Sequence, residues 1–248
     1  MTLSGKTVVI VGGDVSLVRA LAMGVAEAGA DTCLANTKNP ASLDGIALAI
    51  RSRGHRVLAL EAARPASSRE VEENVAAIYA EFGNIDVLIN VIDGFLPANL
   101  LDLSRDHLDK LVSMRTDDAF WWCQTVARRM VRLGKHGSIV NLVSTVAPSD
   151  PDVSPLHHLT GSVGAIVLTK SIAAELLESR IYVNAIVRQV QVSGVERSDW
   201  SGEDRLIGPR TGVQDKFERV VRTAISLALA DRTSMAGEVV YIDDDTFS

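Results

Sequence analysis

The chain has 248 residues, of which 47% are hydrophobic, and a formal net charge of −6. An open α/β domain can reach about 250 residues as one unit, so this length can bury a single sizeable core. The acidic balance gives no general attraction to nucleic acid or anionic membrane, and no apolar run approaches the roughly 18–20 residues of a membrane span. We therefore expect neither nucleic acid nor a membrane as a partner.

The two cysteines do not indicate a metal site. Cys33 falls in a predicted strand and Cys123 in a predicted helix, and no His, Cys or carboxylate spacing around them resembles a metal site. The start of the chain leads directly into an apolar run without a cleavable signal pattern. These features predict a cytoplasmic protein without a metal site.

Short apolar runs alternate with longer amphipathic stretches along the chain. The runs are apolar on both faces, as in a parallel sheet that helices cover on both sides, and predict strands at 7–11, 31–35, 56–61, 86–90, 138–142, 181–186 and 239–243. The stretches between them predict helices near 15–28, 41–53, 68–82, 103–133, 156–179 and 214–229. This alternation predicts a single doubly wound Rossmann-like domain over 1–248, with a seven-stranded parallel sheet.

One segment, 188–212, differs from the rest of the chain. It is polar, rich in Gly, Ser and charge, and contains Trp200 and Pro209. Loops of this length in compact domains are usually active-site lids or disordered segments. The segment is therefore predicted to be a lid-like loop.

Six runs together resemble the short-chain dehydrogenase/reductase (SDR) family. In chain order they are Val8–Gly13, Ile85–Asn90, Gly137–Ser144, Leu168–Ala173, Tyr182–Ile186 and Gly237–Asp243. They follow the order and the near-standard spacing of the family's glycine-rich turn, its fourth and fifth strands, its catalytic helix and its last two strands. The resemblance covers essentially the whole chain and implies the family's Rossmann-like fold.

The resemblance also implies where a nicotinamide dinucleotide would bind. The family's first turn is Thr-Gly-x-x-x-Gly-x-Gly, which lets the backbone approach the diphosphate at a helix N-terminus. Here Ser16 and Val18 stand at the second and third glycines, and Asp14 adds a negative charge beside the expected diphosphate. The turn thus opposes this ligand in three ways.

The remaining cofactor positions also depart from the family. Asn36 replaces the carboxylate that accepts from the adenosine ribose hydroxyls, although Asn36-Thr37-Lys38 leaves a 2′-phosphate site as an alternative. Ile92 and Asp93 replace Ala-Gly after the fourth strand, and Arg188 begins the pair that replaces the Pro-Gly lining the nicotinamide. No cofactor is therefore expected on this chain.

The family moves its proton through Asn, Ser, Tyr and Lys. The matching positions are Arg115, Ser144, His158 and Ser162, so only the serine is retained. A shift of the alignment by one residue would place His157 at the tyrosine position. Neither alignment supplies a tyrosine or a lysine, and hydride transfer by the family mechanism is not expected.

Other uses of these residues stay open. A repurposed, non-redox enzyme would use His158 as a general base, with Ser144 as its partner and Arg115 or Arg188 as an anion clamp. The two arginines would otherwise pair with the carboxylates at Asp93, Asp117 or Asp118. A ligand-sensing protein on the same scaffold is a third hypothesis.

Two predicted helices indicate an oligomer. Phe120, Trp121 and Trp122 are consecutive on the helix at 103–133 and cannot all face one core, because a helix turns about 100° per residue. The helix at 156–179 carries the small residues Gly161, Ser162, Gly164 and Ala165. In the resembled family these two helices form the four-helix contact between subunits, and exposed aromatic residues are favoured at interfaces.

The leading hypothesis is a catalytically silent subunit. It would assemble with a homologous active SDR subunit, as a hetero-oligomer and expected tetramer, through the helices at 103–133 and 156–179. NAD would be held by the active partner, a dehydrogenase of the hydroxyacyl-CoA type. The resemblance includes heteromeric acyl-CoA dehydrogenases of the hydroxybenzylsuccinyl-CoA dehydrogenase type, in which only one of two homologous subunits holds NAD.

Overall fold

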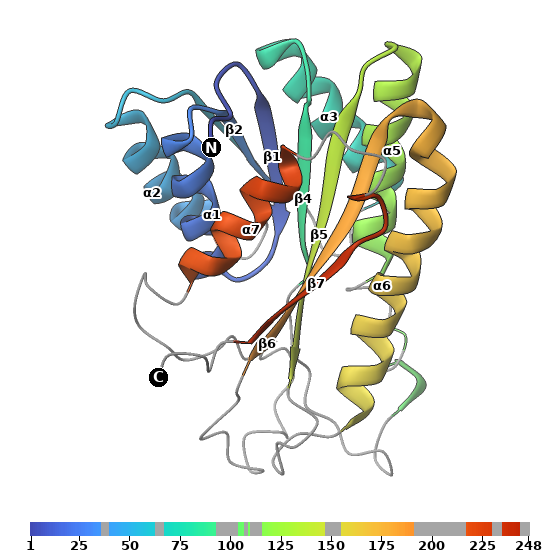
Figure 1. Ribbon diagram of the computed structural model, residues 1–248. Coiled ribbons are helices and arrows are strands. Elements are labelled where there is room, and N and C mark those ends of the chain that lie inside the picture. Colours follow the sequence, from blue (N-terminus) through green and yellow to red (C-terminus); the bar gives the residue numbers. More distant parts are fainter. Residues whose placement is uncertain are drawn as a thin grey trace.

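The computed structural model describes residues 1–35, 40–62, 67–92, 104–106, 109, 116–146, 155–190, 217–229 and 235–243. Seven parallel strands form one sheet in the order β3-β2-β1-β4-β5-β6-β7 (Figure 1). The strands are β1 Thr7–Gly12, β2 Asp31–Ala35, β3 Val57–Leu60, β4 Val87–Ile92, β5 Gly137–Val146, β6 Ile181–Val190 and β7 Val239–Asp243. The predicted Rossmann-like α/β fold with seven parallel strands is confirmed.

Helices cover both faces of the sheet. They are α1 Val15–Glu27, α2 Pro40–Arg51, α3 Ser68–Phe82, α5 Asp118–Arg132, α6 Pro155–Leu176 and α7 Glu218–Ala228, with a 3₁₀ turn at Leu177–Ser179. One apolar cluster joins α1, α2 and α7 to one face, and a second joins α3, α5 and α6 to the other (Figure 1). No helix among the described residues is long and apolar enough to cross a bilayer.

Strand alternation explains how one sheet serves two cores. Successive side chains of a strand point to opposite faces. In β1, Val8 and Ile10 join the cluster under α1, whereas Val9 and Val11 join the cluster under α3 and α5. Continuous apolar runs are therefore required here, and those runs made the strands recognisable in the sequence.

The strands β5 and β6 each run four residues past their predicted ends, and this corrects the lid prediction. The β5 and β6 strands pair over ten positions, from Gly137 opposite Ile181 to Val146 opposite Val190. Residues 188–190, assigned from sequence to the lid-like loop, therefore belong to β6 because their backbone is hydrogen-bonded to β5. The rest of that segment, 191–212, lies outside the described residues.

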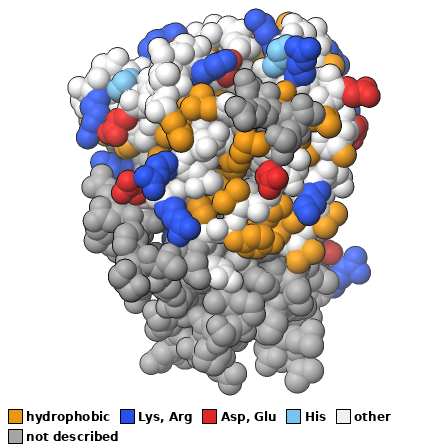
Figure 2. All heavy atoms as spheres, in the orientation of Figure 1, with side chains coloured by type: hydrophobic (Ala, Val, Ile, Leu, Met, Phe, Trp, Pro, Cys, Tyr) orange, Lys and Arg blue, Asp and Glu red, His pale blue; other side chains and the backbone are white. Residues whose placement is uncertain are grey.

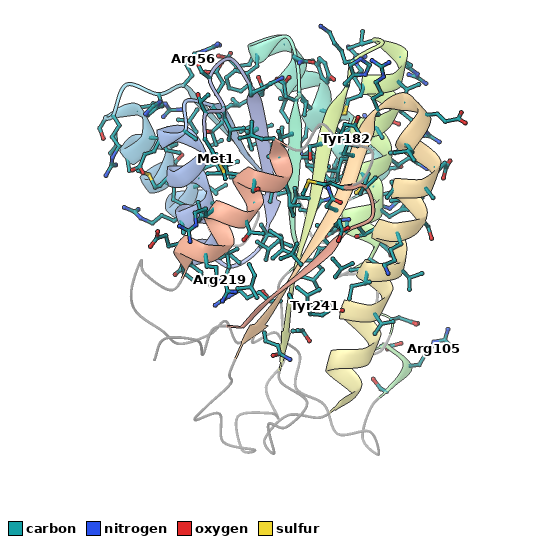
Figure 3. The ribbon with its side chains drawn as sticks, viewed as in Figure 1. Met1, Arg56, Arg105, Tyr182, Arg219 and Tyr241 are labelled. Carbon is teal, nitrogen blue, oxygen red and sulfur yellow. The ribbon has the colours of Figure 1, made fainter. Side chains whose placement is uncertain are left out.

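The amino edge of the sheet is held by an ion-pair cluster. Arg56 donates to Asp31 at 2.9 Å and to Glu81 at 3.2 Å, and its guanidinium lies 4.9 Å from the centre of the Phe82 ring. Figure 3 shows Arg56 at the upper edge of the sheet, away from Arg219 at the start of α7. This cluster is structural, since it lies at the edge opposite to the expected ligand site.

Candidate functional site

The candidate site lies at the carboxyl edge of the sheet, where β5 and β6 run towards the lower part of Figure 1. Ligands of open α/β sheets bind outside the carboxyl ends of the strands. Ile92 ends β4, and Ser144 and Arg188 lie near the ends of β5 and β6. Ser16 lies in the first turn of the helix that follows β1.

The N-terminus of α1 is occupied by a side chain of this chain. The Asp14 carboxylate accepts from the backbone N–H of Ser16 at 2.8 Å and from that of Leu17 at 3.4 Å. These N–H groups and the helix dipole are what a diphosphate would use at this position. Asp14 therefore caps the helix and supplies the negative charge that a dinucleotide would otherwise bring.

The turn before α1 has no spare room. Gly13 has φ +84°, and a Cβ at this position would collide with the side chain of Val91. Val18, at the third family glycine, lies 3.3 Å from the same position and is fully buried. Its side chain fills the space between α1 and the sheet, whereas Ser16 is exposed.

Ile92 likewise fills space rather than bordering a cavity. It is buried in a small cluster with Ala119 of α5, and with Val143 and Ala165. Its side chain therefore packs beneath α5 and α6, at the position where the family has a small residue. Asp93, the next position, lies outside the described residues.

Arg188 is the only fully buried cation among the described residues, with 1% of its surface exposed. Its guanidinium lies 4.8 Å from the centre of the Phe217 ring, immediately before α7. This stacking holds the cation inward by a cation–π interaction. A buried guanidinium here occupies the strand end where the family lines its nicotinamide pocket, and it is not exposed as an anion clamp for a ligand in solution.

Ser144 lies beside Arg188 in the paired strands. It is buried, and its neighbour Val143 packs with Ala165 of α6. Because side chains alternate along a strand, Ser144 points to the other face, towards the cluster under α1 and α7.

Several predicted site positions cannot be placed by side chain. His158 and Ser162 belong to the first turns of α6, but their side chains are outside the described part of the structure. Asn36, Arg115 and Asp93 fall in undescribed stretches of the chain. The Ser144–His158 distance and the 2′-phosphate alternative therefore stay predictions.

A buried polar network that was not predicted from the sequence lies beside this site. The Asn90 amide donates to the Asn141 oxygen at 2.9 Å and to the Cys123 sulfur at 3.2 Å. The Asn141 amide donates to the Thr169 hydroxyl at 2.9 Å, and that hydroxyl donates to the Ala165 carbonyl at 2.7 Å. The signal in the sequence was one asparagine within the apolar part of each of two strands, which indicates a buried partner.

Burial governs the chemistry of both thiols. Burial raises the pKa of the Cys123 thiol to about 12, against the lowering effect of its hydrogen bonds to Asn90 and Asn141. Burial also raises the pKa of the Cys33 thiol. Neither sulfur is a nucleophile at neutral pH, because the reactive species is the thiolate.

The consecutive aromatic residues of α5 divide between core and surface. Trp122 is buried in the cluster under α3, α5 and α6. Phe120 and Trp121 are partly exposed, and their rings meet edge to face with centres 5.2 Å apart. Phe120 borders a groove between α5 and α6.

These residues do not fit a nicotinamide dinucleotide. The helix N–H groups are bound to Asp14, the third glycine position is filled by Val18, and the nicotinamide position holds the buried Arg188. A diphosphate would have to displace a carboxylate that is already hydrogen-bonded and of the same charge.

Known proteins show where the chain belongs. The family profile described as short chain dehydrogenase matches residues 6–201. The chain is 30% identical to a 2-dehydro-3-deoxy-D-gluconate 5-dehydrogenase of Dickeya dadantii over 188 residues, which is 74% of this chain and 71% of that protein. It is 29% identical to a gluconate 5-dehydrogenase of Gluconobacter oxydans over 252 residues, which is 98% of this chain and 94% of that protein.

The fold agrees with solved structures. A short-chain type dehydrogenase/reductase from Mycobacterium marinum superposes with a TM-score of 0.78 at 24% identity, covering 98% of this chain and 95% of that one. An acetoin dehydrogenase from Enterobacter cloacae superposes with a TM-score of 0.74 at 22% identity. From the profile match, which spans most of its length, the chain belongs to the short-chain dehydrogenase family.

Proposed function

We propose that this chain is a catalytically silent member of an oxidoreductase family, assembled with an active, NAD-dependent SDR relative that it stabilises. The observation that carries the proposal is the Asp14 carboxylate bound to the N-terminus of α1 at 2.8 and 3.4 Å. A family member that used a dinucleotide would need those N–H groups free for the diphosphate.

The catalytic positions support the same proposal. The proton relay of the family needs a phenol and an ammonium, and the sequence has His158 and Ser162 at these positions. A serine cannot supply the positive charge that lowers a neighbouring pKa. Ser144 is retained, but it lies beside the buried Arg188.

The surface of α5 and α6 supports assembly with another subunit. Val163 and Val167 of α6 are 47% and 58% exposed, and Val131 and Leu133 at the end of α5 are similarly exposed. Figure 2 shows hydrophobic side chains gathered on the face that carries β7 and α6. Exposed apolar side chains that gather on one face are typical of an interaction site.

The substrate of the active partner has two candidate classes. The sequence resemblance predicts a hydroxyacyl-CoA, with the hydroxybenzylsuccinyl-CoA dehydrogenase type as one identity. The relatives named above act, by their names, on gluconate or a related sugar acid. In both classes the proposed role of this chain is structural, and the partner supplies NAD and the proton relay.

The test is a binding titration of the purified chain with NAD, NADH, NADP and NADPH, followed by calorimetry and by nicotinamide fluorescence. An active SDR enzyme serves as the positive control in the same buffer. The expected result is no saturable binding up to about 1 mM nucleotide. Any binding free energy would then be weaker than about −4 kcal/mol, which corresponds to a Kd of about 1 mM. Micromolar binding of any of the four nucleotides contradicts the proposal.

A further inference from the structure

The strand β3 forms one end of the sheet. Among the described strands it pairs with β2 alone, so its other edge faces away from the sheet. All of its residues, Val57–Leu60, are apolar and partly exposed. Exposed edges are templates for pairing with a strand of another molecule, and proteins usually protect them with a charge or a proline in the strand. Since β3 has neither, the contacts along its outer edge decide whether it can pair.

The backbone groups of β3 alternate between the two sides of the strand. The Arg56 carbonyl accepts from the Thr32 N–H of β2 at 3.1 Å. In a paired strand, residues that bond to one neighbour alternate with residues whose N–H and C=O groups point the other way. The outer edge is therefore formed by the N–H and C=O groups of Val57, Ala59 and Glu61.

Side chains from both faces of the sheet reach this edge. Arg51, the last residue of α2, donates from its guanidinium to the Val57 carbonyl at 3.2 Å. Asn74 of α3 donates from its amide to the Glu61 carbonyl, also at 3.2 Å. Because α2 packs on one face of the sheet and α3 on the other, the two donors approach β3 from opposite sides. Both ends of the outer edge thus have a carbonyl that already accepts a hydrogen bond.

We infer that Arg51 and Asn74 close the β3 edge to a second copy of this chain, so that the sheet does not extend from one molecule into the next. A symmetric, antiparallel pairing of this edge would be centred on Ala59. Residues that exchange both hydrogen bonds recur at every second position, so Val57 would face Glu61 of the second copy. This pairing would need the two carbonyls that Arg51 and Asn74 occupy.

The charges next to β3 do not give this protection. Arg56 and Glu61 flank the strand with opposite signs, so an antiparallel copy would bring unlike charges towards each other. The partly exposed apolar side chains of β3 favour association as well. Among the described residues, the hydrogen bonds to the outer carbonyls are therefore the feature that opposes pairing. They act whether or not the chain has a partner subunit.

The test compares the full chain with the double variant Arg51→Ala and Asn74→Ala. Sedimentation over a range of concentrations should show that the self-association constant rises at least about tenfold, because the Val57 and Glu61 carbonyls become available to a second copy. Hydrogen exchange locates the contact. In the double variant, exchange of the Ala59 N–H should slow as the protein concentration rises, whereas in the unsubstituted chain it should not change.

Two further variants serve as controls. Arg53→Ala removes the same charge close to Arg51, but Arg53 donates to the Ala49 carbonyl of α2 at 3.0 Å, so self-association should stay as in the unsubstituted chain. Ala59→Pro, added to the double variant, removes the central outer N–H, which the pairing with β2 does not use, and should reverse the association. Thermal unfolding followed by circular dichroism checks that each variant is folded.

Three results would overturn the inference. The first is a folded double variant that associates no more than the unsubstituted chain. The second is an association that leaves exchange of the Ala59 N–H unchanged, because it would then use another surface. The third is an equal effect of Arg53→Ala, because the lost charge would then be the cause. None of these results changes the nucleotide titration, so the proposed function is tested separately.

Discussion

Asp14 combines two roles in one carboxylate. It satisfies the first N–H groups of α1, and it carries the negative charge that a helix N-terminus attracts. In an SDR that binds a dinucleotide, the ligand would meet both needs. Here a side chain of the chain itself caps the helix.

Replacing Asp14 separates the cap from the charge. Asp14→Ala should lower the free energy of unfolding by about 1 kcal/mol, because the Ser16 and Leu17 N–H groups lose their acceptor. Asp14→Asn should cost only a few tenths of that, because an amide oxygen still accepts. Urea unfolding measures both changes, and equal losses for the two variants would show that the charge rather than the hydrogen bond matters.

The buried thiols give a prediction about reactivity. Burial raises the pKa of Cys123 to about 12, and it also raises the pKa of Cys33. At pH 8 the folded chain should therefore react with no equivalents of a disulfide reagent such as dithionitrobenzoate, since little thiolate is present. In denaturant both thiols should react, and fast reaction of the native chain would contradict the burial of these side chains.

The sequence alone allowed the role of a residue to be predicted where the family has a defined residue at that position. Ser16, Val18 and Arg188 could be singled out because each stands at a family position of known purpose. Phe217 could not be identified as the partner of Arg188, because a long stretch of chain separates them and the contact exists only after folding. The sequence showed that Asp14 is negatively charged, but the hydrogen bonds by which it caps α1 could be identified only from the backbone geometry.

At the scale of elements, buried hydrogen bonds join two strands to the helices that cover them. Asn90 of β4 and Asn141 of β5 connect to Cys123 of α5 and Thr169 of α6. A fully buried network of this kind specifies how the helices sit on the sheet, because each displaced partner leaves a polar group unsatisfied. The network thereby positions the two helices proposed to contact the partner.

Two threonines allow a matched test of this network. Thr169 and Thr32 are both fully buried. Thr169 accepts from Asn141, whereas within the described part of the chain the Thr32 hydroxyl has no hydrogen-bond partner. Thr169→Val should lower the free energy of unfolding by about 1–3 kcal/mol, since it leaves the Asn141 amide unsatisfied. Thr32→Val should be neutral or stabilising, because it removes a buried hydroxyl that bonds to nothing.

Thermal and urea unfolding of the two variants provide the comparison. If both variants lost the same free energy of unfolding, the loss would come from replacing a hydroxyl and not from breaking the network. The expected difference between the two variants is larger than the error of such measurements, which is a few tenths of a kcal/mol.

The ends of helices and strands were predicted well where apolar and polar residues follow a clear pattern, and less well near the candidate site. The strand Asp31–Ala35 was predicted at its observed bounds, because Gly29 shortly precedes it and the polar Asn36 follows it. The ends of β5 and β6 were missed, because Ser144, Arg188 and Gln189 are polar and yet lie in paired backbone. Pairing between strands, which depends on distant sequence, extended them beyond their apolar parts.

At the scale of the molecule, helices cover both faces of the sheet, but exposed apolar side chains are more frequent on one of them. Among the described residues, α1, α2 and α7 expose one large apolar side chain, Leu48, whereas α5 and α6 expose Val131, Val163 and Val167. The order of apolar strands and amphipathic helices was sufficient to predict this layered fold. The identity of a partner was not, because it depends on the chemistry of a second chain.

Exposed valines on α6 provide a test of the assembly. Val163→Glu together with Val167→Glu should abolish the hetero-complex in native mass spectrometry and sizing, because two charges would be buried against the partner without compensation. The free energy of unfolding of the chain alone should change by less than about 0.5 kcal/mol, as is usual for exposed positions. The control is Leu48→Glu on α2, a residue 67% exposed in the structure, which should leave the complex intact.

The same variants also separate assembly from folding. Binding to the folded state stabilises a protein by mass action, by about 2.7 kcal/mol when the partner is at 100 times its Kd. The unsubstituted chain and Leu48→Glu should gain this stability when the partner is added, and the Val163→Glu/Val167→Glu variant should not. If all three gain it equally, α6 does not contribute to the interface, and the contact between the subunits must lie on another face of the sheet.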